Sequence, residues 1–291
     1  MPPGTDGPYY TPGRRARKAR LVRWAGVPEL PEVETARRRA ERALRGRRVA
    51  AVAVARDPIV YEGVTPARFA AALLGRRVRA VRRKGKHLWM ELDRRPWPLF
   101  HFGMTGSFEV YRDAVARPRF WKVEIAMDDG TRLAMRDPRR FGRIRLQERP
   151  EDEQPLAGLG FDALEGLPPT RALALRLSRR RGPVKAVLLD QRLFAGVGNW
   201  IADEVLYQAG IDPRRPASSL REAEVARMRT RLHAIARLAV AVEADDARFP
   251  PSWLFHARWG RGEGARTARG ERIVHLTIGG RTTAFVPSRQ R

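Results

Sequence analysis

The feature that most limits the possible folds of this sequence is a change in the period of its apolar residues. Residues 49–146 show mainly the alternation of β-strands, as in Leu88, Met90 and Leu92, whereas residues 172–243 show helical spacing. Strands and helices that are segregated in this way along a chain are typical of an α+β fold. We therefore predict an N-terminal β-sandwich flanked by helices, followed by a separate helical domain.

Two helices are expected beside the strands of the sandwich domain, which we place at residues 28–146. The first starts at Pro31, a residue suited to a first helical turn, and ends at Gly46. The second follows Thr65, whose hydroxyl can cap the first turn, and ends at Gly75. Both are expected to pack their apolar faces against the strands.

The remaining chain is predicted to contain a linker, a helical domain and a hairpin. The linker, at 147–171, is rich in proline, glycine and acidic residues within an otherwise basic chain. The helical domain is placed at 172–250, and the final segment, 251–291, is expected to form a hairpin that turns at Gly279-Gly280. The predicted helices of the helical domain are roughly 172–180, 183–190, 199–209, and a long one from Ser218 or Ser219 to about Glu243.

The charge of the chain predicts a polyanionic partner. Among its 291 residues, 58 are basic and 32 acidic, which gives a formal net charge of +26. Self-repulsion of this size is offset when the protein binds a phosphate-rich partner, and nucleic acid is the partner that we expect. The alternative is a bias of the genome, because 53 of the basic residues are arginine and GC-rich codons favour arginine.

The absence of cysteine excludes disulfides, thiolate zinc sites and cysteine nucleophiles. No apolar run approaches the roughly 20 residues of a membrane span, and the N-terminus lacks the apolar core of a signal peptide. We therefore expect a cytoplasmic, nucleoid-associated bacterial protein with no membrane partner.

The chemistry of the chain is predicted to begin at Pro28. Residues 1–27 carry six basic and one acidic side chain, four prolines and no sustained periodicity, so they are expected to be a disordered or untranslated extension. If translation starts at Val27, from a GTG codon that is read as Met, removal of that residue exposes Pro28 as a free secondary amine. The amine would then stand next to the carboxylate of Glu29.

Such an amine can act on a damaged nucleoside. It can attack C1′ and displace the base, and the iminium that results acidifies the C2′ proton and permits strand cleavage by elimination. Glu29 could protonate the deoxyribose ring oxygen as the ring opens. Taken alone, Pro28-Glu29-Leu30-Pro31 also fits an ordinary helix start.

A second motif, Gly196-Val197-Gly198-Asn199, opens the predicted helix 199–209. Its glycines let backbone N–H groups approach a ligand, Asn199 can cap the helix, and a helix N-terminus favours an anion. The motif therefore predicts a phosphate site, with an ordinary turn as the alternative. With the preceding helix, 183–190, it forms a helix, two turns and a helix.

A third pair of motifs places one bulky side chain in each of two glycine-bounded turns. Met104 lies in the turn 101–106, and Phe141 lies in the turn 137–142. Such side chains can enter a base stack and fill the space that an extruded base leaves. Taken alone, however, Met104 and Phe141 are better interpreted as core residues. His87 and His101 lack a set of metal ligands, so we interpret both as structural or hydrogen-bonding residues.

Together these motifs resemble the formamidopyrimidine-DNA glycosylase family of helix-two-turn-helix base-excision enzymes. The similarity runs in order from Pro28 to about Gln290. It implies that Pro28 is the Schiff-base nucleophile, Glu29 the acid, and Lys86 a contact to the phosphate beside the lesion. The residues that it implies for DNA binding are Met104, Arg139 and Phe141, which would fill the vacated stack and face the orphan cytosine, and Lys185, Asn199 and Arg281.

The C-terminus departs from the pattern of most bacterial members, which end in a four-cysteine zinc finger. Here the hairpin ends in 285–290 without a metal ligand, and the surrounding sequence resembles the plant and fungal branch, which has a zincless finger. We therefore expect no zinc and no other cofactor. Packing would have to replace the metal, and the residues expected to supply it are Val274, Leu276, Ile278 and Phe285.

The resemblance implies a monomeric bifunctional DNA glycosylase and AP lyase that excises oxidised purines from damaged double-stranded DNA by β,δ-elimination. Only about ten residues separate the long helix from Trp253, which leaves little room for a loop that folds over 8-oxoguanine. Formamidopyrimidines and further-oxidised guanines are thus the expected substrates. The alternatives are a nucleic-acid-binding protein without catalysis and an endonuclease VIII-like glycosylase for oxidised pyrimidines.

Overall fold

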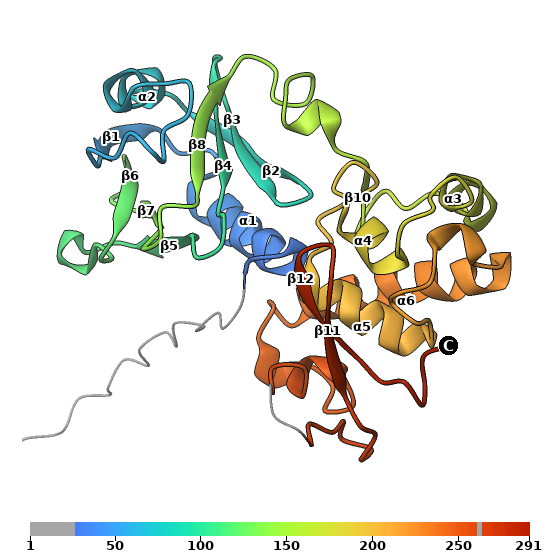
Figure 1. Cartoon of the computed structure of the whole chain (residues 1–291). Helices are drawn as coiled ribbons and strands as arrows, with labels where there is room; N and C mark the ends of the chain where they lie inside the picture. Colours follow the sequence, from blue (N-terminus) through green and yellow to red (C-terminus); the bar gives the residue numbers. More distant parts are fainter. Residues whose placement is uncertain (1–26, 261–263) are drawn as a thin grey trace, which may run out of the picture.

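The computed structural model describes residues 27–260 and 264–291, so the expected extension lies, apart from Val27, outside the described residues. Two four-stranded antiparallel sheets form the sandwich (Figure 1). The first sheet has the order β1 (Val49–Val54), β6 (Trp121–Met127), β7 (Arg132–Arg136) and β5 (Ser107–Tyr111). The second has the order β2 (Val78–Lys84), β3 (His87–Leu92), β4 (Trp97–His101) and β8 (Arg143–Gln147). The predicted α+β class and N-terminal sandwich are confirmed.

Two helices complete the core of the sandwich, as the apolar spacing predicts. Helix α1 spans Leu30–Leu44 and helix α2 spans Pro66–Leu73. The hydroxyl of Thr65 accepts a hydrogen bond from the backbone N–H of Arg68, which satisfies one free donor of the first turn of α2. Phe69 is buried, and its removal from water contributes roughly 1.5–3 kcal/mol. The helix is therefore held by its cap and by its apolar face.

The helical domain contains a short parallel pair, β9 (Phe161–Asp162), which precedes its helices, and β10 (Phe194–Ala195), which lies between the second and the third of them. Its helices are α3 (Thr170–Leu177), α4 (Val184–Leu189), α5 (Asn199–Ala209) and α6 (Glu222–Ala241). Its core also includes Leu30, the first residue of α1. The beginning of α1 is thus buried in the helical domain, while the rest of that helix packs on the sandwich.

The predicted start of the long helix at Ser218 or Ser219 is wrong. These serines belong to a separate 3₁₀ turn, Ala217–Ser219, and the hydroxyl of Ser219 donates to the carbonyl of Pro216. Helix α6 begins at Glu222 because Glu224 accepts a hydrogen bond from the backbone N–H of Arg221. A carboxylate near the first turn therefore defines this terminus.

The C-terminal hairpin consists of β11 (Val274–Ile278) and β12 (Arg281–Phe285). It turns through Gly279 and Gly280, at φ values of 57° and 70°, as the glycine pair predicts. The expected packing is partly wrong, because Val274 and Leu276 are only partly buried. Ile278 and Phe285 are buried as expected. The small core beneath the hairpin is formed instead by Tyr207, Leu254, Ile273, Ala284 and Val286.

None of the helices within 27–260 and 264–291 combines the length and the apolar character that crossing a bilayer requires.

Candidate functional site

The site is organised by Glu29, the residue that immediately precedes α1. Its side chain is buried and accepts hydrogen bonds from the backbone N–H groups of Trp200, at 2.9 Å, and Ile201, at 3.2 Å. These groups belong to the first turn of α5, where backbone donors have no partner within the helix. The sandwich domain thus supplies a carboxylate to the N-terminus of a helix in the other domain, and Pro28 stands next to it.

Glycine is required where the two domains meet. A Cβ atom on Gly198 would lie 2.2 Å from Cδ of Glu29, and one on Gly196 would lie 2.6 Å from Cδ1 of Leu30. Gly196 also has a φ of 95°, a backbone conformation that residues other than glycine rarely adopt. The glycines of the predicted phosphate motif therefore make room for the start of α1.

Both carboxyl groups beside Pro28 hold protons more tightly than exposed ones. Burial raises the pKa of Glu29, although Lys86 and the N–H groups of Trp200 and Ile201 oppose the shift. Burial, helped by the nearby charge of Glu29, raises the pKa of Glu32 to about 8. Glu32 also accepts a hydrogen bond from the backbone N–H of Glu29 at 2.9 Å. The site thus contains two carboxyl groups whose protonated form is favoured by burial.

Lys86 brings a cation to this pair of carboxyls from the turn between β2 and β3. Burial lowers the pKa of its ammonium group, and the charges of Glu29 and Glu32 partly oppose that shift. Arg281, at the exposed tip of the hairpin, adds to the lowering. Lys86 is therefore near enough to Glu29 and to Arg281 for both charges to affect its pKa, although the three residues are far apart in the sequence.

Pro28 borders a small hollow of about 30 Å³, between α1 and the segment 102–108. Glu32 and Phe102 also line it. This volume is that of a water molecule rather than a nucleobase. A base would therefore have to lie outside this hollow.

Two turns that carry the predicted stack-filling residues are held together by Asp137. Its buried carboxylate accepts hydrogen bonds from the hydroxyl of Thr105, at 2.8 Å, and from the backbone N–H of Gly142, at 2.7 Å. Arg139 and Phe141 are exposed, and the guanidinium of Arg139 lies 5.0 Å from the ring centroid of Phe141. Met104 is partly exposed. The three predicted side chains thus come from two adjoining turns, and the alternative that Phe141 is a core residue does not hold.

Asn199 connects α5 to the hairpin. Its side-chain amide donates to the carbonyl of Thr282 at 2.9 Å, and its Oδ1 is buried without a hydrogen-bond partner. Gly198, rather than Asn199, is the N-cap of α5, so the predicted capping role of Asn199 is wrong. Its amide instead fixes β12 next to the helix N-terminus.

The placement of Lys185 among the residues that contact DNA is not supported. Its side chain has no exposed surface and forms an ion pair with Asp203. Arg258 donates to the same carboxylate at 2.6 Å. An ammonium group enclosed in this way cannot reach a phosphate, so Lys185 joins α4 to α5 inside the protein.

Sequence reasoning missed several residues that build the site. Glu32 has a visible signal, since it lies three positions after Glu29 and so fits a capping pair. Asp203 has no local signal, because its partners come from distant segments. Asp137 binds the nearby Gly142, but its contact with the distant Thr105 has no local signal either. Gln290 also escaped notice; its side chain binds the backbone of Val286 and of Ile211, which fastens the C-terminal segment to the helical domain.

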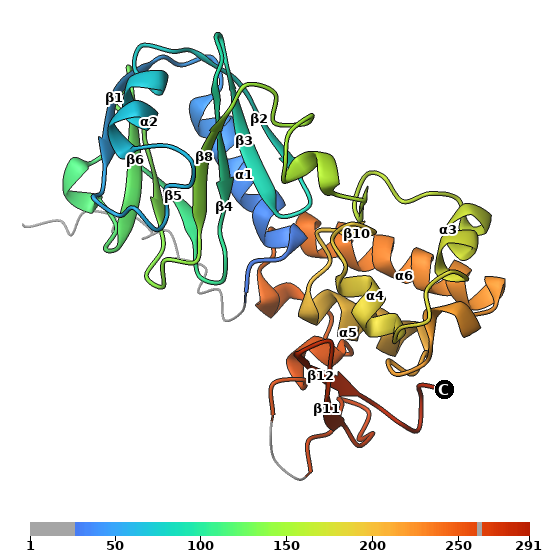
Figure 2. The same ribbon diagram turned by 45° about the horizontal axis from the view of Figure 1, so that its top comes forward.

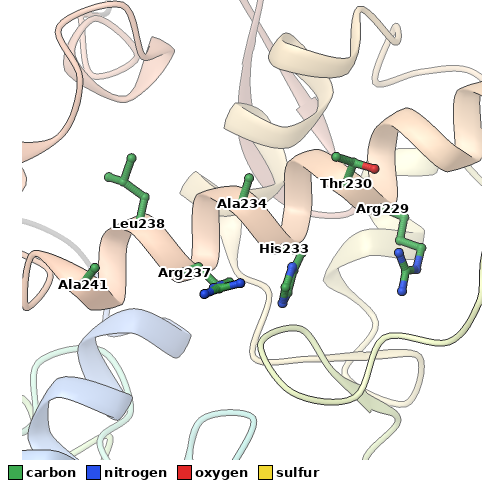
Figure 3. Close-up of a pocket in the computed structure, with 7 residues that line it drawn as sticks. All are labelled: Arg229, Thr230, His233, Ala234, Arg237, Leu238 and Ala241. Carbon is green, nitrogen blue, oxygen red and sulfur yellow. The ribbon is translucent and has the colours of Figure 1, made fainter.

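A larger and shallower hollow, of about 510 Å³, lies elsewhere, along one face of α6. Arg229, His233 and Arg237 point to one side of the helix there (Figure 3). None of the predicted site residues lines this hollow, so it is separate from the Glu29 site.

The hairpin does not offer the ligands that a zinc finger would need. The chain has no cysteine, and among the residues with described positions no three His, Asp or Glu side chains are grouped as a metal site. Tetrahedral zinc needs four such donors. The hairpin therefore does not fit a zinc ion.

Comparison with known proteins identifies related sequences along both domains. The family described as formamidopyrimidine-DNA glycosylase N-terminal domain matches residues 27–144, and the formamidopyrimidine-DNA glycosylase H2TH domain matches residues 159–250. A formamidopyrimidine-DNA glycosylase of Arabidopsis thaliana is 40% identical over 91% of this chain and 71% of its own length. One from Pelobacter propionicus is 37% identical over 91% of this chain and 100% of its own length.

Solved structures agree with these sequence matches. The MutM (Fpg) protein of Thermus thermophilus has a TM-score of 0.74 at 33% identity and covers 90% of this chain and 98% of its own. A complex between an LlFpg mutant and a THF-containing DNA has a TM-score of 0.79 at 25% identity, and the match covers 91% of this chain and 100% of that chain. The identity and coverage of these relatives, together with the two matched domains, show that this chain belongs to the formamidopyrimidine-DNA glycosylase family.

Proposed function

We propose that this protein is a base-excision repair enzyme, a bifunctional DNA glycosylase and AP lyase that removes oxidised purines from duplex DNA. The observation that carries the proposal is the position of Glu29. It is buried next to Pro28, its pKa is raised, and it is bound to the first turn of α5. An acid is thereby held beside the residue that becomes a secondary amine when the chain starts at Pro28.

The proposed reaction begins with attack of the Pro28 nitrogen on C1′ of the damaged nucleotide. The N-glycosidic bond breaks and its electron pair leaves with the base, while Glu29 donates a proton to O4′ as the sugar ring opens. The iminium that forms draws electrons from C2′, so loss of the C2′ proton breaks the C3′–O bond by β elimination. A second, δ elimination then breaks the C5′–O bond.

DNA binding is proposed to use the cations and the turns around this centre. The pKa of Lys86 responds to the charges of both Glu29 and Arg281, and Asn199 lies at the N-terminus of α5. These groups suit phosphate oxygens. Met104, Arg139 and Phe141 project from adjoining turns that suit entry into a base stack. The relatives solved with DNA, among them an LlFpg mutant with THF-containing DNA, support this assignment.

The proposed substrates are formamidopyrimidines and further-oxidised guanines in preference to 8-oxoguanine. Helix α6 ends at Ala241 and Trp253 is already buried in the core of the helical domain, so the intervening segment is short. Single-turnover excision from duplexes that carry each lesion opposite cytosine measures the preference. Faster removal of 8-oxoguanine than of the other lesions would contradict it.

The decisive experiment compares two forms of the protein on abasic DNA in the presence of borohydride. One form starts at Pro28 after removal of an initiator Met, and the other has all 291 residues, so its Pro28 nitrogen is an amide. Mass spectrometry verifies both N-termini. We expect a covalent adduct from the first form only, because borohydride reduces the imine that a free amine forms with the sugar.

Two results would overturn the proposal. Equal trapping by both forms would place the nucleophile elsewhere. Salt-sensitive binding of abasic DNA without an adduct from either form would favour the alternative of a nucleic-acid-binding protein without catalysis.

A further inference from the structure

A buried ion pair lies beneath the turn that carries Lys86. The guanidinium of Arg83 donates to the two carboxylate oxygens of Asp162, at 2.6 Å and 3.1 Å, and to Glu34 at 3.0 Å. Only 1% of the Arg83 side chain is exposed. The same Asp162 carboxylate accepts a hydrogen bond from the backbone N–H of Gly85 at 2.8 Å. Asp162 therefore binds both a side chain and the backbone of the turn that leads to Lys86.

This contact joins the two domains. Arg83 and Gly85 belong to the sandwich domain, whereas Asp162 lies in β9, which pairs with β10 in the segment before α5. Figures 1 and 2 both show the end of the β2–β3 hairpin beside β10. A Cβ atom on Gly85 would lie 3.1 Å from Cβ of Ala195, which shows how closely the turn rests on β10. The turn is thus held by the domain that provides the N-terminus of α5.

The arrangement suits positioning more than stability. A buried ion pair seldom adds net stability, because desolvation of the two charges offsets their attraction. Here, however, the fork of Arg83 and the two acceptor oxygens of Asp162 define one orientation for the turn. Arg83 also donates to the carbonyl of Gly85 at 3.0 Å, which leaves the turn little freedom before Lys86.

We propose that Arg83 and Asp162 are positioning residues that hold Lys86 in place relative to Glu29 and to the phosphate beside the lesion. The inference rests on the proposed function, in which Lys86 contacts that phosphate. It predicts that loss of the ion pair affects the reaction through Lys86 and through no other group. Asp162→Asn keeps the shape of the side chain but removes its charge.

The test is a double-mutant cycle on the form that starts at Pro28. Lys86→Ala, Asp162→Asn and the double variant are compared in single-turnover cleavage of an abasic duplex, and in affinity for a duplex with a non-cleavable abasic analogue. We expect each single variant to cleave about 10- to 100-fold more slowly, since small misplacements of a reacting group have effects of this size. The double variant should be no slower than Lys86→Ala, because the two changes remove one interaction.

Glu224→Gln provides the matched control. Glu224 is buried and binds Arg215 at 2.7 Å at the start of α6, away from Lys86. The Glu224→Gln variant should have a lower midpoint of unfolding, but its cleavage rate should be unchanged at a temperature where the protein is folded. Arg83→Lys keeps the positive charge but loses the forked guanidinium, so it should slow cleavage less than Asp162→Asn does. It replaces Asp162→Asn in the cycle if that variant does not fold.

Multiplicative losses in the double variant would overturn the inference, and so would unchanged cleavage and affinity in Asp162→Asn and Arg83→Lys. The affinity cycle separates this result from a failure of the proposed function. If neither the unmodified protein nor any variant cleaves DNA, the proposed function fails. The interaction energy between Asp162 and Lys86 can still be measured from the affinities of the four proteins for the duplex with the non-cleavable analogue.

Discussion

At the scale of single residues, the site depends on glycines as much as on charged groups. The carboxylate of Glu29 reaches α5 only because position 198 has no side chain. We predict that Gly198→Ala abolishes most of the activity, because its Cβ would lie 2.2 Å from Cδ and 2.4 Å from Oε1 of Glu29. Displacement of the acid should slow single-turnover cleavage about 100-fold, and overpacking should cost about 1–3 kcal/mol in urea unfolding.

Gly182→Ala is the control for this substitution. It is also a glycine of the helical domain, but a Cβ atom there would meet no other atom within 4 Å. Its cleavage rate should equal that of the unmodified protein. If Gly198→Ala cleaved DNA at the normal rate, the placement of Glu29 against the first turn of α5 would not be required for the reaction.

At the scale of elements, the paired strands β3 and β4 contain two buried histidines, and the protonation state of one of them, His101, affects the stability of the fold. His87 and His101 face each other in register, with ring centroids 4.6 Å apart. Burial lowers the pKa of His101 to about 4 and that of His87 to about 2, from an ordinary value of 6.5. Nδ1 of His101 accepts a hydrogen bond from the backbone N–H of Gly103, so this nitrogen must be unprotonated in the fold.

This depressed pKa predicts the direction of a pH effect. Between pH 6.5 and about 4 the unfolded chain binds a proton at His101 that the folded chain does not, so the free energy of unfolding decreases as pH falls. Glu32 and Glu204, whose pKa values burial raises to about 8 and about 7, act in the opposite direction. The measurement is therefore the difference between wild type and His101→Phe in urea unfolding at pH 7 and pH 5.

We expect the loss of stability from pH 7 to pH 5 to be smaller in His101→Phe than in wild type. An equal loss in the two proteins would show that His101 does not remain neutral in the fold. A larger loss of stability in His101→Phe than in wild type would likewise show that His101 is not neutral in the fold.

The packing of the C-terminal hairpin against α5 depends on Asp203. It accepts hydrogen bonds from Arg258 and from the backbone N–H of Ala284, and it pairs with Lys185. Asp203→Asn should destabilise the protein by roughly 3–5 kcal/mol in urea unfolding, because two buried cations lose their counter-charge. Asp212→Asn, whose partner Arg214 is exposed, should cost no more than about 1 kcal/mol. Equal costs would show that the Asp203 cluster does not dock the hairpin.

The same elements show what the sequence could and could not predict. The cap at Thr65 and the Gly279-Gly280 turn were predictable, because each depends on neighbouring residues. The burial of Lys185 was not, since its partner Asp203 lies on another helix. Asp137 likewise acts on a turn more than 30 positions away, as its contact with Thr105 shows. Interactions between distant segments are the part of this site that local patterns do not contain.

At the scale of the whole molecule, a strongly basic chain builds one centre from both of its domains. The sandwich supplies Glu29 and Lys86, and the other domain supplies the first turn of α5 and the Asp162 carboxylate. The net charge is +26, so nonspecific attraction to DNA is expected over much of the surface. Charge alone therefore does not identify which cations contact phosphate, whereas salt dependence counts them.

Each phosphate contact releases counterions, so the slope of log K against log salt concentration changes by about 0.9 per contact. We predict that Lys86→Ala and Arg281→Ala each make this slope shallower by about 0.9 for a duplex with a non-cleavable abasic analogue. Arg95→Ala is the control, because this exposed arginine lies in the turn at the end of β3 that is remote from Lys86. It should weaken binding little and leave the slope unchanged. If Arg95→Ala changed the slope as much as Lys86→Ala does, DNA would contact the general surface charge rather than the centre around Glu29.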